Sequence, residues 1–286
     1  MKELVVLSGK GGTGKTTIVA SFAALAKNKV LVDCDVDAAD LHLLLQPTVN
    51  RSEEFWSGQT AVIDKSYCTG CGVCEQVCRS NAIENFTVDP IPCEGCGFCF
   101  HVCPEKTIRM KDSLAGHWFI SDTKYGPLVH ARLGIAEDNS GKLVALVRQQ
   151  AKALAQEQNL NYILSDGPPG IGCPVISALS GANLAILITE PTLSGMHDLE
   201  RAIGVCHHFG VPALVCINKH DINEENTSNT EIFCRDMGVE VISKLPFDNV
   251  VTEALVHGLP VVEYSSNGIA TEIEALWKRV LTALGS

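Results

Sequence analysis

Eight cysteines between residues 68 and 103 constrain the fold of this 286-residue chain more than any other feature. They form two runs with the same spacing, C-x2-C-x2-C-x3-C. The first run consists of Cys68, Cys71, Cys74 and Cys78, and the second of Cys93, Cys96, Cys99 and Cys103. Because closely spaced cysteines on a tight loop can point to one site, the two runs predict two metal-binding sites in a small module.

The module resembles bacterial ferredoxins with two [4Fe-4S] clusters, in which each run supplies three ligands and the fourth comes from the other run. The resemblance implies that the two runs hold each other in place and that both clusters are bound by thiolates. We therefore expect cluster 1 to be held by Cys68, Cys71, Cys74 and Cys103, and cluster 2 by Cys93, Cys96, Cys99 and Cys78.

Zinc and disulfide bonds are the alternative uses of these cysteines. A zinc site with four thiolates usually combines two C-x2-C pairs across a longer spacer, so the observed spacing favours iron–sulfur clusters. Disulfides are not expected, because the chain opens with Met1-Lys2-Glu3 and passes directly into an apolar strand pattern without a secretory signal.

A glycine-rich loop near the N-terminus is the second strong feature. An apolar run at residues 4–7 precedes G-K-G-G-T-G-K-T, which matches the P-loop pattern G-x-x-x-x-G-K-[ST] between a strand and a helix. Its backbone N–H groups and the helix N-terminus form an anion site. Lys15 is expected to reach the β- and γ-phosphates and Thr16 to bind Mg²⁺. The expected nucleotide-binding residues are Gly9, Lys10, Gly11, Gly12, Thr13, Gly14, Lys15, Thr16 and Thr17.

Lys10 gives this loop a particular form. The sequence K-G-G-T-G-K-T resembles the deviant Walker A motif of the MinD/ParA ATPases, in which the extra lysine crosses to the nucleotide of the facing subunit. The resemblance implies Mg²⁺-dependent ATP hydrolysis that is slow without a partner. It also implies an ATP-dependent dimer with a second copy or a sister chain, and catalytic roles for Lys10, Lys15 and Asp35.

Further positions match the family's switch segments. Asp35 follows a buried-strand pattern and corresponds to the switch I aspartate near Mg²⁺ and the attacking water. Asp166 ends a later strand like a Walker B aspartate, and Gly170 corresponds to the switch II glycine beside the γ-phosphate. Other acidic residues near switch I, with less defined roles, are Asp33, Asp37 and Asp40.

The base-recognition segment follows a third strand. Asn218 corresponds to the family's adenine-binding asparagine, with Lys219 and Asp221 beside it. The same letters match the N-K-x-D guanine motif of GTPases, but the deviant P-loop belongs to ATPases, so ATP is favoured over GTP. Pro246 and Asp248 resemble the loop that closes over the base; a plain surface turn is the alternative.

Alternating strand and helix patterns predict an α/β fold. Near-continuous apolar strands between helices are typical of a mostly parallel sheet covered on both faces. We expect a discontinuous P-loop NTPase domain, residues 1–60 and 113–286, with an inserted α+β bacterial-ferredoxin-like domain at 61–112. A hairpin is expected within residues 116–136. Strands are expected at 3–8, 30–34, 161–166, 184–189, 213–217 and 239–245, and helices near 15–27, 142–158, 174–180, 194–209, 226–237 and 248–257.

Charge and hydropathy limit the partners. The net charge of −11 argues against a nucleic-acid partner, because phosphate binding needs a basic face. No apolar stretch approaches the ~20 residues that span a bilayer. The apolar stripe from Ile269 to Leu284 lacks the basic face of a membrane-surface helix, so we expect it to pack on the sheet. The expected location is the cytoplasm.

Three functions are compatible with these motifs. The favoured one couples ATP-driven dimerisation or switching to electron transfer through the two clusters, with an unidentified redox partner. The second is an ATP-dependent carrier that assembles iron–sulfur clusters or another metallocofactor for a client protein. The third is a MinD-like positioning ATPase whose clusters are structural or redox-sensing. Fold and motif alone do not decide among them.

Overall fold

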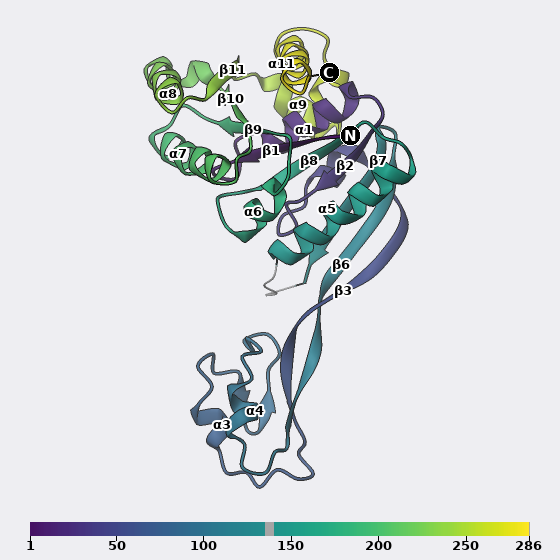
Figure 1. Ribbon diagram of the computed structural model, residues 1–286, viewed down its shortest axis with the longest axis vertical. Helices are drawn as coiled ribbons and strands as arrows, with labels where there is room; N and C mark the ends of the chain where they lie inside the picture. The colour runs from purple at the N-terminus through teal and green to yellow at the C-terminus, as the bar shows by residue number, and fades with distance from the viewer. Residues whose placement is uncertain (135–139, 286) are drawn as a thin grey trace. The chain divides into compact units, whose positions relative to one another are not determined.

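The computed structural model describes residues 1–134 and 140–285, and the chain divides into two compact units (Figure 1). Unit 1 contains Met1–Ser52, Phe119–Ala131 and the C-terminal part of the chain from Ser140 onward. Unit 2 contains Glu53–Trp118 and a short segment that begins at Arg132. The insert expected at 61–112 lies within unit 2, and its assignment as a ferredoxin domain stays a prediction.

A nine-stranded sheet has the order β11-β10-β9-β1-β8-β2-β7-β6-β3. The pairs from β11 to β7 are parallel, as expected from the apolar strands between helices. The six strands predicted from the sequence are β1 (Lys2–Ser8), β2 (Lys29–Asp33), β8 (Tyr162–Pro169), β9 (Leu184–Thr189), β10 (Ala213–Asn218) and β11 (Glu240–Leu245). The register pairs Asp33 with Asp166 and Ser8 with Pro169, so three strands end together at one edge.

Helices cover both faces of this sheet, which confirms the expected α/β architecture. On one face α1, α10 and α11 pack together, and on the other α5, α6 and α7 contact the strands (Figure 1). The helices of unit 1 are α1 (Lys15–Leu25), α2 (Leu41–Leu45), α5 (Ser140–Glu157), α6 (Cys173–Leu179), α7 (Leu193–His208), α8 (Glu224–Asp236), α9 (Asn249–Val256), α10 (Val261–Tyr264) and α11 (Ile269–Ala283), with a 3-10 turn at His220–Ile222.

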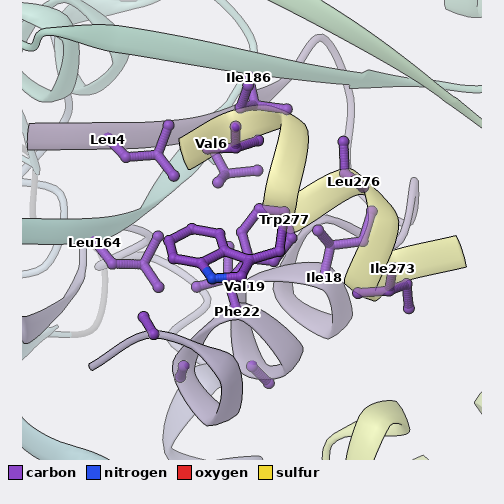
Figure 2. Packing of buried hydrophobic residues seen from close by; sticks show 14 of the residues in the cluster. Leu4, Val6, Ile18, Val19, Phe22, Leu164, Ile186, Ile273, Leu276 and Trp277 are labelled. Atoms are coloured by element: carbon purple, nitrogen blue, oxygen red, sulfur yellow. The ribbon is translucent and has the colours of Figure 1, made fainter. Parts of the chain in front are cut away.

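The C-terminal helix α11 packs on the sheet, as its apolar stripe predicts. Ile273, Leu276 and Trp277 are buried against α1, and the rings of Phe22 and Trp277 have centroids 4.9 Å apart (Figure 2). Burying side chains of this size stabilises the fold by roughly 1.5–3 kcal/mol each. Among the residues that the structure describes, no helix combines the length and the apolar character needed to cross a bilayer.

The hairpin expected within residues 116–136 consists of β6 (Ile108–Thr123) and β7 (Gly126–Leu133), although residues 135 and 136 lie outside the described part of the chain. The two strands are neighbours in the sheet. A connection as short as the one from Thr123 to Gly126 joins antiparallel strands, because parallel ones need a long crossover. The hairpin therefore returns the chain to the parallel sheet, where β7 pairs with β2.

Unit 2 repeats one small arrangement twice. In each cysteine run a short helix starts after a glycine in the left-handed region: α3 (Val73–Gln76) follows Gly72 and α4 (Phe98–Val102) follows Gly97. A small two-stranded sheet pairs β4 (Ile83–Glu84) with β5 (Thr87–Val88). Its apolar core contains Ala61, Cys74, Ile83, Cys99 and Ile108. The strand β3 (Thr48–Ile63), absent from the sequence prediction, leads into this unit.

Candidate functional site

A cavity of about 730 Å³ lies in unit 1, at the edge where the parallel strands end. Open α/β sheets bind ligands at the carboxyl ends of their strands, and small-molecule pockets have volumes of this order. The cavity is lined by the P-loop from Gly11 to Thr17 and, among the other expected residues, by Asp35, Asn218, Lys219, Pro246 and Asp248. The structure thus brings residues from separate segments of the sequence to one cavity.

The P-loop is shaped as an open cradle. Gly14 has φ 87°, and a β-carbon there would lie 2.5 Å from Nδ2 of Asn218, so only glycine fits. Asn218 Nδ2 donates a hydrogen bond of 2.8 Å to the carbonyl oxygen of Thr13, which ties the base-side segment to the loop. The Thr13 hydroxyl is buried without a hydrogen-bond partner, and open space surrounds Gly12. These features fit the phosphates of a nucleotide.

Lys15 lies among three carboxylates. Its Nζ is 2.5 Å from Oδ1 of Asp166 and 3.8 Å from Oδ2 of Asp35, and it is buried. Burial alone would lower the pKa of Lys15, but the neighbouring carboxylates of Asp166 and Asp35 outweigh it and raise that pKa. Asp33 is also buried; its carboxylate accepts hydrogen bonds from the backbone N–H of Asp35 at 3.1 Å and of Leu41 at 3.3 Å. Asp33 therefore fixes the backbone that presents Asp35.

The cavity also supplies the oxygens that Mg²⁺ prefers. Thr16 and Asp35 both line it, and a hydroxyl with one or two carboxylates is a usual protein contribution to a Mg²⁺ site. Asp166 lies behind them and contacts the ammonium of Lys15 rather than the cavity. Gly170 is likewise outside the lining; it has φ 88° and its N–H donates to the carbonyl of Ser8.

The titration of Asp35 leads to a testable expectation for stability. Burial, offset by Lys15, raises the pKa of Asp35 from 3.8 to about 6. The folded chain therefore binds a proton at the Asp35 carboxyl more tightly than the unfolded chain does. Proton binding at Asp35 stabilises the folded state at low pH, and this stabilisation is lost as pH rises through about 6. In protein free of nucleotide and Mg²⁺, we expect the free energy of unfolding of wild type, relative to Asp35→Asn, to fall by about 1 kcal/mol between about pH 5 and about pH 7.5. Denaturant unfolding at several pH values measures this; parallel curves would contradict it.

Two predicted residues point away from the cavity. Lys10 Nζ lies 3.3 Å from the hydroxyl of Ser194 and 3.9 Å from Oε2 of Glu190. Asp221 Oδ1 accepts a 2.7 Å hydrogen bond from the backbone N–H of Phe247 and so holds the loop between β11 and α9. Asp248 lines the cavity and also caps α9, accepting from the N–H of Val250. Asp221 thus positions this loop rather than lining the cavity.

The apolar wall of the cavity was not predicted from the sequence. It is formed by α2, α9 and the start of α11, whose other apolar residues belong to the core, and by Phe247 in the loop between β11 and α9. Several of these side chains stay exposed to solvent: Leu43 by 59%, Phe247 by 53% and Leu255 by 43%. An apolar wall suits the faces of a purine ring. The wall residues are Leu43, Leu44, Phe247, Val251, Leu255 and Ile269. No spacing in the sequence marks them as a set.

The cysteines of unit 2 line two separate small cavities. Cys68, Cys71, Cys74 and Cys103 line the first, and Cys93, Cys96, Cys99 and Cys78 line the second. Each cavity therefore receives three cysteines from one run and the last cysteine of the other. Among the described residues, no group of three or more His, Cys, Asp or Glu side chains is arranged to hold a single metal ion. In a [4Fe-4S] cluster, in contrast, each of the four thiolates binds a different iron, so they need not converge on one ion.

Cys78 and Cys103, which line the cavity of the other run, have a different electrostatic environment from the neighbouring cysteines. Burial alone would raise the pKa of Cys78, but hydrogen bonds from Ser80 and the backbone outweigh burial and lower it. A hydrogen bond from Thr107 lowers the pKa of Cys103 in the same way. The backbone nitrogen of Ala82 lies 3.3 Å from Sγ of Cys78. A thiolate, rather than a thiol, is the form that binds metal, so these contacts favour ligation.

The fold and the cavity together define a P-loop nucleotide-binding protein. Residues 4–261 match the CobQ/CobB/MinD/ParA nucleotide binding domain, and the chain belongs to this family. It is accordingly a P-loop ATPase. Relatives include an uncharacterised protein of Methanocaldococcus jannaschii, 31% identical over 97% of this chain and 96% of its own length, and the septum site-determining protein MinD of Bacillus subtilis, 25% identical over 98% and 89%.

Solved structures share the fold across nearly the whole chain. MinD from Pyrococcus horikoshii, complexed with Mg-ADP, has a TM-score of 0.58 and 20% identity and covers 98% of this chain and 95% of its own. The Aquifex aeolicus MinC:MinD cell division complex contains a chain with a TM-score of 0.60 and 21% identity, with 99% and 96% covered. These structures confirm the fold, and the match of residues 4–261 to the family's nucleotide-binding domain confirms the family predicted from the deviant P-loop.

Proposed function

We propose that this ATPase holds two [4Fe-4S] clusters in unit 2 and couples an ATP-dependent change, dimerisation or switching, to electron transfer through them. The observation that carries the proposal is the lining of the two small cavities by four cysteines each. Cys103 joins the first run and Cys78 joins the second, as cross-ligated clusters require. When bound, the clusters supply one-electron redox chemistry.

The nucleotide site fits Mg-ATP. Lys15 neutralises charge that develops on the transferring phosphate, Thr16 and Asp35 provide oxygens for Mg²⁺, and Asn218 recognises the base. The MinD of Pyrococcus horikoshii is complexed with Mg-ADP, which supports the same class of ligand here. ATP remains favoured over GTP, because Asp221 is engaged with the N–H of Phe247 and does not line the cavity.

The coupling rests on the path of the chain. Asp35 is followed by α2, whose Leu43 and Leu44 line the nucleotide cavity, and then by β3, which begins at Thr48 and continues into unit 2. Switch segments are held by the γ-phosphate and Mg²⁺ and relax after hydrolysis. A change at Asp35 therefore has a continuous covalent route to the cysteine module, through α2 and β3.

A second candidate is favoured by the comparisons. The named relatives include several septum site-determining MinD proteins, which supports a MinD-like positioning ATPase whose clusters are structural or redox-sensing. The two candidates differ in whether the nucleotide changes the clusters. Electron transfer coupled to ATP needs clusters whose potential or exposure depends on the bound nucleotide, because only differential interaction with two states can link two sites.

Redox titration in two nucleotide states distinguishes them. With a non-hydrolysable ATP analogue instead of ADP, we expect the cluster potentials to shift by ~30–60 mV, which for a one-electron couple is roughly 0.7–1.4 kcal/mol of coupling. Asp35→Ala, which removes the switch carboxylate, should reduce the shift. Identical potentials and EPR spectra in both states would favour the positioning ATPase, and zinc without sulfide in the purified protein would refute both cluster hypotheses.

A further inference from the structure

The ammonium of Lys10 occupies a small polar cage at the start of α7. Its Nζ lies 3.3 Å from the hydroxyl of Ser194, 3.5 Å from that of Thr192 and 3.9 Å from Oε2 of Glu190. Lys10 is outside the lining of the nucleotide cavity, although its neighbours in the P-loop line it. The lysine that is proposed to act on a facing subunit is therefore held by its own chain.

Glu190 is shared by two lysines. Its Oε1 lies 2.5 Å from Nζ of Lys219 and its Oε2 lies 3.9 Å from Nζ of Lys10, and its side chain is only 15% exposed. Lys219 lines the nucleotide cavity and follows Asn218, whose side-chain oxygen accepts from the N–H of Lys219. The carboxylate of Glu190 thus connects Lys219, on the base side of the nucleotide cavity, with Lys10 of the P-loop.

The cage is part of a rigid segment. Thr192 caps α7 by accepting from the N–H of Gly195 at 3.0 Å, and the Thr189 hydroxyl donates to the carbonyl of Gly195 at 3.1 Å. Close to the cage, Gly9 packs so tightly on α7 that a β-carbon would lie 2.3 Å from Cβ of Asp198. Because the P-loop and the start of α7 are packed together, Lys10 meets partners whose positions are already fixed.

We infer that Glu190 is a positioning residue that retains Lys10 in the single chain and releases it when ATP and a second copy engage. The inference rests on the proposed ATP-dependent dimerisation. Release comes from the second copy, since the phosphates of its nucleotide compete with the Glu190 carboxylate for the ammonium of Lys10. Glu190 therefore raises the ATP concentration at which dimers form.

A double-mutant cycle tests this role. In Glu190→Gln, which keeps the shape of the side chain and removes its charge, the ATP concentration for half-maximal dimerisation should fall by about two- to fivefold, the range of a partly exposed ion pair. The fall should disappear when Lys10→Ala is also present, because the effect acts through Lys10. Glu200→Gln, a change at an exposed position of α7, is the control. Sedimentation measures dimers, and an equal fall in the Lys10→Ala background would overturn the inference.

A second measurement does not depend on dimerisation. In nucleotide-free monomer, an amine-reactive reagent followed by mass spectrometry should modify Lys10 about two- to fivefold faster in Glu190→Gln than in wild type. The exposed Lys27 provides the internal reference, and thermal melting checks that the variant is folded. An unchanged rate at Lys10 would refute the retention by Glu190. Failure of wild type to dimerise with ATP, together with faster modification, would instead refute the proposed dimer and leave the cage intact.

Discussion

Lys15→Ala is expected to abolish ATP hydrolysis and to weaken nucleotide binding by more than about tenfold. Lys15 is buried in the P-loop, and its ammonium forms ion pairs with both Asp166 and Asp35. Electrostatic groups of this kind are worth several kcal/mol in a transition state, so the loss in rate should exceed about 100-fold. Titration calorimetry with ATP and Mg²⁺ and a phosphate-release assay measure the two effects.

The control for this experiment is Lys27→Ala, which removes an exposed lysine just beyond the other end of α1. That variant should bind and hydrolyse ATP as wild type does. Lys15→Ala also leaves Asp166 without the ion pair to Lys15, so its fold is checked by circular dichroism before binding is measured. A folded Lys15→Ala protein that binds ATP as tightly as wild type would show that the P-loop assignment is wrong.

Cys103→Ser is expected to remove the first cluster while the second stays. Anaerobically purified wild type should contain about eight irons and eight sulfides per chain, and the variant about four of each. The reason is spatial: Cys103 belongs to the second run in sequence but lines the cavity of Cys68, Cys71 and Cys74. Iron and sulfide analysis, with EPR of the reduced protein, measures the outcome.

Two further variants sharpen this test. Cys78→Ser should remove the second cluster instead, since Cys78 lines the cavity of the second run. Cys173→Ser changes an exposed cysteine outside both runs and should retain full iron content. If Cys103→Ser lost the cluster held by the second run, each run would bind its own cluster and the crossed assignment would fail.

The strands and the P-loop could be predicted because local patterns specify them. The buried strands β1 and β9 are apolar over most of their length, and the spacing of Gly9, Gly14 and Lys15 marks the loop between β1 and α1. In contrast, β3 was not predicted: most of its residues are exposed, so it lacks the apolar alternation that identifies a half-buried strand.

Roles that depend on long-range packing could not be predicted either. Asp221 was expected to contact the base, yet its carboxylate accepts a hydrogen bond from the N–H of Phe247. That contact joins segments far apart in sequence. Glu190 follows β9 and belongs to no recognisable sequence motif. Its proposed role comes from its ion pairs with Lys10 and Lys219. The sequence specifies which side chains are available, while the packing of unit 1 decides which of them meet.

The hydrogen bond from Asn218 to the carbonyl of Thr13 has a consequence for nucleotide exchange. It joins the segment expected at the base to the P-loop through a contact within the chain itself, so little ordering remains to oppose binding. In the proposed assignment, the part of the cavity around Asn218 and Thr13 makes the same contacts with ADP and ATP and cannot distinguish the two nucleotides. The discrimination between the two nucleotides therefore falls to Asp35, which is expected near Mg²⁺ and the terminal phosphate, and from Asp35 the chain continues through α2 and β3 toward the cysteines.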